Sequence, residues 1–202
     1  MRKQLTFGFF LIGAMSMLIM SWHYLLPPDS GILIGKQIAQ FDWYKLMFRI
    51  HVLCGIIAIF SGPFQLYPFF LRTYSRAHKP VGYLYAVSVL LSGLAGFGVA
   101  PFAMGGWISG LGFSTLACLW IFSLIRGIIA ARTKELIQHK MWMFLNYGFT
   151  FSAITLRTFL LIPLLTDVPF IPVYRFAAWF SWIINGAMAY YFFRKTTQIV
   201  ST

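Results

Sequence analysis

The sequence predicts an all-α polytopic membrane protein with six transmembrane helices. Of its residues, 59% are hydrophobic and only 10% are charged, whereas charged residues make up about a quarter of a soluble domain. Six apolar runs are long enough, at roughly 20 residues, to cross a hydrocarbon core of about 30 Å. They cover residues 6–26, 46–70, 81–103, 108–130, 141–165 and 171–193. We therefore expect one integral membrane domain over residues 1–202, surrounded by the lipid bilayer.

The distribution of charge predicts the topology. The formal net charge is +12, from 16 Lys and Arg and four acidic residues. In a soluble protein this excess would suggest a nucleic-acid partner, but here the basic residues gather in alternate connections. They precede the first run, separate the second from the third and the fourth from the fifth, and follow the sixth. The positive-inside rule then places both termini in the cytoplasm, and no nucleic-acid partner is expected.

The first run is interpreted from the residues at its two ends, and the second from a face of small residues. The first begins with MRKQ but continues to Leu26 without a small-residue cleavage pattern, so an uncleaved helix is expected rather than a signal peptide. The second run has a face of small and polar residues that lie within about 40° on either side of a common direction, which lets another helix or a flat ligand approach closely. This face consists of His51, Gly55, Ala58, Gly62 and Gln65.

The third run is expected to begin at Pro80, because proline suits the first turn of a helix and disfavours helix in the preceding Lys79. His78 would then lie at the cytoplasmic edge of the membrane. The fourth run ends among basic residues, and the sixth contains Asn185 as its one clearly buried polar candidate.

The fifth run carries a polar stripe. At about 100° per residue, four polar side chains lie within roughly 20° of a common direction. They are His139, Asn146, Thr150 and Arg157. Polar side chains in hydrocarbon cost several kcal/mol unless they face protein, water or a bound group, so the stripe is expected to face inward.

An internal similarity suggests a duplicated hairpin. The segment AHKPVGYLY from residue 77 and the segment QHKMWMFLN from residue 138 each place a His-Lys pair at the start of a run. Runs two and three would then repeat as runs four and five, forming a four-helix core flanked by runs one and six.

The chemistry of this core is limited by what the runs lack. No Asp or Glu lies within any of the six runs, which argues against a carboxylate-based proton- or sodium-coupled transporter. Arg157 accordingly has no acidic partner there. Its side chain either extends to the membrane interface or binds an anion such as a haem propionate, lipid phosphate or substrate carboxylate, and the inward-facing stripe favours the anion. The two cysteines, Cys54 and Cys118, have no CxxC spacing and are expected to be packing residues.

Three histidines are candidate haem or metal ligands. Paired imidazoles on facing helices can hold haem iron, and His78 and His139 are predicted on the same side of the membrane. His51 would be a second ligand or a quinone-contacting group, but run four has Gly112 where a matching histidine would be needed. The alternative is that both His-Lys pairs only end their helices or contact lipid phosphate.

Several of these residues also carry a family resemblance. His51, Gly55, GPFQ at 62–65, HKPVGYLY at 78–85 and HKMWM at 139–143, with Arg72, Asn146 and Arg157, resemble the bacterial predicted membrane proteins called domain of unknown function 2306. The family motifs usually have Arg where this chain has Lys79 and Lys140, which weakens a forked anion contact. The resemblance implies a bacterial cytoplasmic (inner) membrane but no settled activity. A looser architectural similarity links the chain to six-helix ascorbate-reducible cytochromes b.

Two functions follow as hypotheses. The first is transmembrane electron transfer with haem b or a metal, working with a quinone or another redox protein; its site would comprise His78, His139, His51, Arg157, Asn146 and Gln65. The second is a non-enzymatic role, either as a carrier of a small anion or lipid or as an assembly factor for a membrane complex. The sequence leaves open whether the protein is an enzyme, and it leaves the oligomeric state undetermined.

Overall fold

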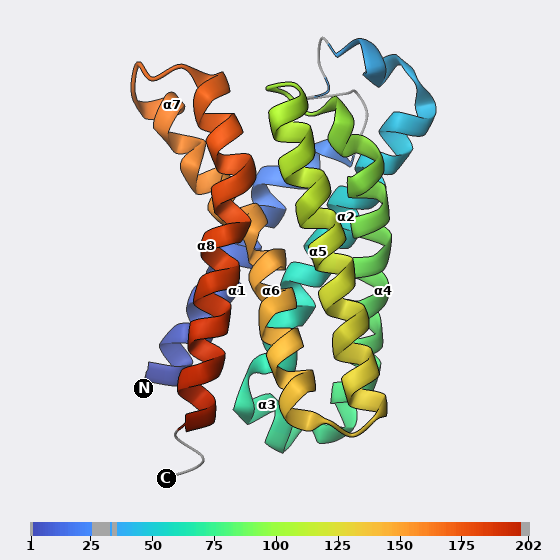
Figure 1. The fold of residues 1–202 in the computed structure, drawn as a ribbon, viewed down its shortest axis with the longest axis vertical. Helices are drawn as coiled ribbons and strands as arrows, with labels where there is room; N and C mark the ends of the chain where they lie inside the picture. Colours follow the sequence, from blue (N-terminus) through green and yellow to red (C-terminus); the bar gives the residue numbers. More distant parts are fainter. Residues whose placement is uncertain (1, 26–32, 34–35, 199–202) are drawn as a thin grey trace. The chain divides into compact units, whose positions relative to one another are not determined.

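The computed structural model describes residues 2–25, 33 and 36–198, and the regular elements in these residues are all helical. This confirms the all-α class. The chain divides into two compact units, Met1–Phe102 and Ala103–Thr202, which are described separately (Figure 1). That they form a single membrane domain with a four-helix core remains a prediction.

Unit 1 is built on an antiparallel pair of long helices, α2 (Asp42–Leu66) and α4 (Ser75–Val99). Helix α1 (Arg2–Ser21) packs along α2, and the short helix α3 (Pro68–Thr73) joins α2 to α4. Short 3-10 helices in the described part of the unit include η1 (Trp22–Tyr24), η3 (Gln37–Gln40) and η4 (Ala100–Phe102).

Lys36 links two segments at the end of unit 1 where α2 begins. Its ammonium donates hydrogen bonds to the Phe102 carbonyl at 2.6 Å and to the Tyr44 hydroxyl at 3.2 Å. Partial burial lowers the pKa of Lys36 from its usual value. The connection before α2 is thereby attached to the end of η4.

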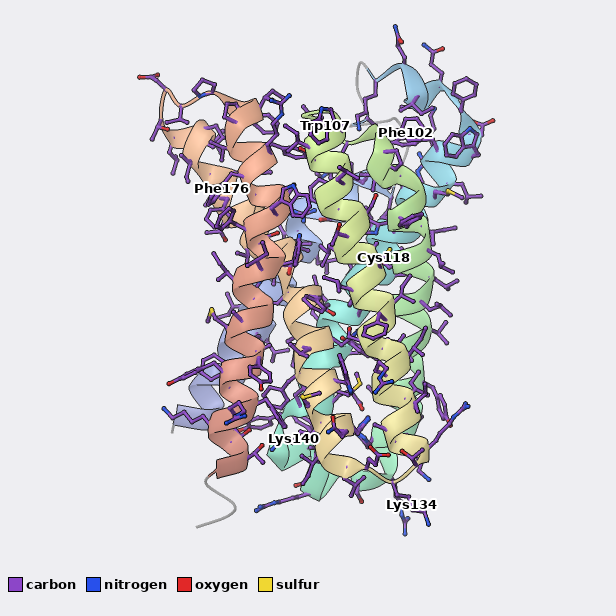
Figure 2. The ribbon with its side chains drawn as sticks, viewed as in Figure 1. Phe102, Trp107, Cys118, Lys134, Lys140 and Phe176 are labelled. Carbon is purple, nitrogen blue, oxygen red and sulfur yellow. The ribbon has the colours of Figure 1, made fainter. Side chains whose placement is uncertain are left out.

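Unit 2 is a three-helix bundle of α5 (Trp107–Arg132), α6 (Leu136–Phe159) and α8 (Phe170–Gln198), with the short helix α7 (Leu161–Leu165) after α6. Figure 2 shows Trp107 and Lys134 at opposite ends of α5, with Lys140 near Lys134 at the start of α6. The basic residues Arg194 and Lys195 at the end of α8 lie at the same end of the bundle as Lys140, because α6 and α8 run in opposite directions (Figure 1).

Four helical stretches are long and apolar enough to cross a membrane: Asp42–Leu66, Ser75–Phe102, Trp107–Arg132 and Leu136–Leu165. They correspond to the second to fifth predicted runs and make this a multi-pass membrane protein. A shorter apolar stretch, Phe10–Tyr24, lies in the region of the first run, and α8 occupies the sixth.

Several helix boundaries differ from the predicted runs, and two of the differences lie beside prolines. Helix α2 ends at Leu66 rather than at residue 70, because Tyr67 has extended backbone and Pro68 begins α3. Helix α4 begins before Pro80, so Lys79 is helical. Proline lacks only the N–H that would bond four residues back, and this loss is small close to a helix start, where several N–H groups have no helical partner anyway.

The small-residue face of α2 packs against α4, so of the two predicted neighbours, another helix or a flat ligand, the structure shows a helix. A Cβ built on Gly55 would lie 3.4 Å from Ser92 Oγ, and one on Gly82 of α4 would lie 3.2 Å from Gln65 Oε1. One on Gly96 would lie only 2.7 Å from His51 Nδ1. The glycines therefore make room for polar side chains between the two helices.

Glycines bring α8 equally close to its neighbours in unit 2. A Cβ on Gly112 of α5 would lie 2.8 Å from the Ala178 carbonyl oxygen. A Cβ on Gly148 of α6 would lie 2.8 Å from both the Asn185 carbonyl oxygen and Ala189 Cβ. Because these atoms belong to the backbone or lie next to it, they cannot move aside without separating the helices.

Candidate ligand pocket and polar helix seams

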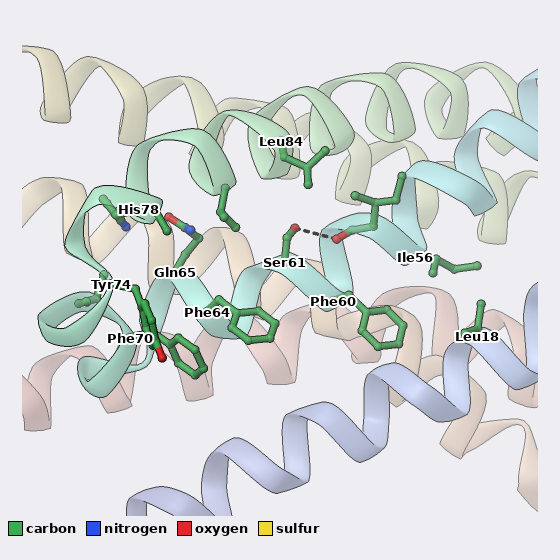
Figure 3. Close-up of a pocket in the computed structure, with 14 residues that line it drawn as sticks. Leu18, Ile56, Phe60, Ser61, Phe64, Gln65, Phe70, Tyr74, His78 and Leu84 are labelled. Atoms are coloured by element: carbon green, nitrogen blue, oxygen red, sulfur yellow. Dashed lines mark hydrogen bonds between the residues drawn. The ribbon is translucent and has the colours of Figure 1, made fainter.

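Unit 1 contains a pocket of about 660 Å³ bounded by α1, α2, α3 and α4 (Figure 3). A volume of this size is typical of sites for small molecules. Its lining is Leu18, Ile56, Ile57, Phe60, Ser61, Phe64, Gln65, Phe70, Leu71, Tyr74, Ala77, His78, Val81 and Leu84.

The polar groups of the pocket are concentrated at one end. Gln65, His78 and Tyr74 lie together at this end, while Leu18 and Ile56 lie at the other (Figure 3). The Gln65 amide rests against Gly82, and His78 is in the first turn of α4. The site therefore offers amide, imidazole and phenol groups at the end of the pocket where α3 joins α2 to α4.

The remaining lining is apolar. Beyond the polar end, Ser61 is the one polar residue among the described lining residues, and it donates to the Ile57 carbonyl at 2.7 Å. Toward the polar end, Phe64 and Phe70 pack edge to face with centroids 4.8 Å apart, and Phe70 stacks on Tyr74 at 5.6 Å. The pocket is thus an apolar channel with an aromatic wall and one hydrogen-bonding end.

His51 lies outside this pocket, in the seam between α2 and α4. Its Nδ1 is 2.9 Å from the Ser92 carbonyl oxygen, and the Ser92 hydroxyl donates to the His51 carbonyl at 2.8 Å. A carbonyl oxygen only accepts, so Nδ1 carries the proton of this bond and Nε2 has the ring's lone pair in the neutral imidazole.

His139 has the same arrangement in unit 2. Its Nδ1 is 2.8 Å from the Gly127 carbonyl oxygen of α5, so Nδ1 again donates. Histidines that ligate metals usually donate their second ring N–H to a carboxylate, carbonyl or water in this way. Both residues therefore have the ring orientation and tautomer that ligation by Nε2 requires.

The polar stripe on α6 faces protein, and its central residues bond to α5. Asn146 is fully buried and donates to the Trp120 carbonyl at 2.6 Å and to Ser123 Oγ at 2.8 Å. The Trp120 indole donates to Thr150 Oγ1 at 2.9 Å. At the far end, Arg157 donates to the Ala153 carbonyl of its own helix at 3.2 Å. Most of the stripe is thus a hydrogen-bonded seam between two helices.

The structure separates two of the proposed ligands. His51 contacts Ser92 and Gly96, whereas His78 lies 14 to 18 residues before them on α4, or about 21 to 27 Å at 1.5 Å per residue. The two histidines cannot share one metal ion. His139 belongs to unit 2, so its pairing with His78 stays a prediction. Within the described part of the chain, no group of three or more His, Cys, Asp or Glu residues is placed to hold a metal.

The position of Gly112 explains why α5 has no counterpart of His51. The backbone of α8 passes within 2.8 Å of where a Cβ would lie, and the Trp179 indole, which donates to the Ile108 carbonyl at 3.0 Å, borders the same place. An imidazole at this position would collide with α8.

Gln65 and His78, which the sequence singles out as candidate cofactor-binding residues, both line this pocket, whereas sequence reasoning did not single out its aromatic wall. The wall depends on α3, which turns Phe70 and Tyr74 back toward α2. Pro68 after a long apolar run was the available signal, because proline at the first turn often starts a new helix.

The sequence matches a known protein family over most of its length. Residues 48–193 match the family model described as predicted membrane protein (DUF2306). The chain belongs to this family. The match covers α2 from Phe48 onward and nearly all of α8, so both units of this DUF2306 protein contribute to it. Neither the curated proteins nor the solved structures gave a match.

Proposed function

We propose that this membrane protein binds an amphipathic, lipid-soluble small molecule in the pocket of unit 1. The observation that supports it is the polarity of the lining: Gln65, His78 and Tyr74 at one end and an apolar channel beyond. The head of the ligand would bond to the polar end, and its tail would lie against Phe60 and Ile56. This corresponds to the lipid-carrier form of the non-enzymatic hypothesis.

The polar end must supply most of the selectivity. Lipid chains are as apolar as the channel, so transfer of a tail from bilayer to pocket gains little beyond closer packing. The hydrogen bonds that the pocket can form with the head of the ligand cannot be formed by the acyl chains of the bilayer. Gln65 and His78 are therefore the residues on which recognition should depend.

Filling the channel should abolish binding. Leu84 lines the pocket and is 51% exposed, so Leu84→Trp adds bulk to the channel without disturbing a buried contact. We expect at least a tenfold loss of labelling by a photoreactive amphiphile, measured by mass spectrometry of the purified protein in nanodiscs.

Leu94→Trp is the matched control, because Leu94 is on the same helix, is 56% exposed and is not part of the lining. This variant should be labelled like the wild type. Equal labelling of both variants would contradict the proposal.

The second candidate is haem-dependent electron transfer, and the Nδ1 bonds of His51 and His139 favour it. When bound, haem b would supply a one-electron couple. His78 and His139 would hold this haem, with Arg157 and Asn146 on the same helix as His139. His51, which cannot share an iron atom with His78, would ligate a second group or contact a quinone. The imidazoles would contribute Nε2 lone pairs held in place by their carbonyl partners.

An optical spectrum tests this second candidate directly. Protein produced with added haem precursor and purified in detergent should show a Soret band that shifts on dithionite reduction. The band should weaken in His139→Leu and persist in His23→Leu, since His23 lies in η1 beside Tyr24. A colourless protein without bound transition metal would exclude the haem hypothesis.

We further propose that α1 and α8 also cross the membrane, giving six spans with both termini in the cytoplasm of a bacterial cell. Support comes from the basic residues at Arg72, Arg76 and Lys79 in unit 1 and at Lys134 and Lys140 in unit 2, which follow the positive-inside rule. Reporter fusions after residue 202 should be active only as a cytoplasmic reporter. Activity of a periplasmic reporter fused at that position would place the C-terminus outside the cytoplasm and contradict the proposed topology.

A further inference from the structure

The pocket lining identifies the class of head group that it can accept. The described lining contains no Lys, Arg, Asp or Glu. The nearby basic residues Arg72, Arg76 and Lys79 are exposed and lie outside the lining. A carboxylate or phosphate head placed between Gln65 and His78 would lose its hydration without gaining a fixed counter-charge, which is costly in a low-dielectric site. The polar end therefore suits a neutral head.

The shape and chemistry of the wall further restrict this head. Phe64, Phe70 and Tyr74 form a continuous run of rings beside Gln65. Aromatic faces and edges pack well against a flat ring, whereas a branched glycerol backbone leaves gaps between them. A planar head group is thus favoured over that of a glycerolipid.

The available donors point to ring carbonyls as the groups that are bound. Gln65 has two amide N–H groups, and a neutral imidazole has one ring N–H. Both can donate to a carbonyl oxygen, and both can also accept from a hydroxyl on the same ring. A planar neutral ring with carbonyl or hydroxyl oxygens and a long apolar tail is the chemistry of a membrane quinone.

We infer that the pocket between α2, α3 and α4 takes the ring of a quinone-class lipid, with oxygens bonded by Gln65 and His78 and the tail directed toward Leu18 and Ile56. This inference rests on the proposed function, since it names the ligand class of the same site. It concerns binding alone and requires no chemical change in the quinone.

Competing photoreactive probes test the inference on the full-length protein in nanodiscs. An azido-substituted short-chain quinone should label peptides within residues 56–84, and excess unmodified quinone should suppress the labelling. A photoreactive fatty acid of matching length should label the same peptides at least tenfold less. Gln65→Leu, which keeps the side-chain size but removes the amide, should reduce quinone labelling about tenfold, as expected for loss of a recognition hydrogen bond.

Gln40→Leu is the control, because Gln40 lies in η3 outside the lining. His78→Leu provides a second test should Gln65→Leu fail to fold, as judged by gel filtration. Strong labelling by the fatty acid with none by the quinone overturns the quinone inference and leaves the proposed lipid-binding function standing. Labelling by neither probe overturns both.

Discussion

Gly148→Leu should destabilise unit 2 by about 3 kcal/mol, because even a Cβ at this position would lie 2.8 Å from the Asn185 carbonyl oxygen and from Ala189 Cβ. Leucine would force α6 and α8 apart, since the opposing atoms are backbone or directly attached to it. The separation would also lengthen the bonds from Asn185 to Thr155 and Ser152, now 2.8 and 3.4 Å. For a protein of this size, such a loss lowers the thermal midpoint by roughly 6 to 12 °C.

Gly8→Leu is the control for this substitution. A Cβ on Gly8 of α1 meets nothing within 4 Å, and leucine favours helix over glycine. Thermal denaturation of both variants in the same detergent, followed by gel filtration of the soluble fraction, should show a lower midpoint for Gly148→Leu alone. An unchanged midpoint for Gly148→Leu would mean that α6 and α8 do not pack through this glycine.

Asn146→Asp should have a still larger effect. The substitution keeps the shape of the side chain but places an acceptor oxygen where Nδ2 now donates at 2.6 Å to the Trp120 carbonyl. Ser123 Oγ could turn to donate to the new carboxylate, but the carbonyl has no proton to offer. An uncompensated charge in the fully buried seam is expected to cost about 3 to 5 kcal/mol.

Asn146→Leu separates the charge from the lost hydrogen bonds. It removes the amide but adds no acceptor, and the Trp120 carbonyl retains the hydroxyl of Ser123, which donates at 3.0 Å. We expect this variant to lose about 1 to 2 kcal/mol, as measured by its thermal midpoint in detergent. If the aspartate variant were as stable as the leucine variant, the seam would have to be open to water.

Hydropathy was sufficient to predict an all-α, multi-pass membrane protein, because it depends on single helices meeting a lipid environment. The topology that the charges predict stays a prediction. The α6 stripe was correctly predicted to face inward, since polar groups cannot face lipid unpaired. Its partner could not be predicted: the Trp120 carbonyl is a backbone group, and nothing in the identity of residue 120 marks it as the acceptor for Asn146.

The sequence singled out two residues of the pocket lining but did not predict the pocket, for a similar reason. Gln65 and His78 stand out in the sequence because polar residues are rare near apolar runs. Phe60 and Phe70 resemble the many other aromatic residues of a membrane protein until the fold brings them together. The break at Tyr67 is decisive here, because a helix continuing to residue 70 would direct Phe70 away from α4.

The division of the chain at Phe102 also affects its biogenesis. Helices α2 and α4 are joined by α3 alone, so the contacts that enclose the pocket form between segments close together in sequence. Such local contacts form quickly and require little loop closure. During synthesis from the N-terminus, the first half of the protein contains every residue of the pocket lining before the last hundred residues have been translated, so the ribosome delivers a complete binding site ahead of the helices that carry Asn146 and His139.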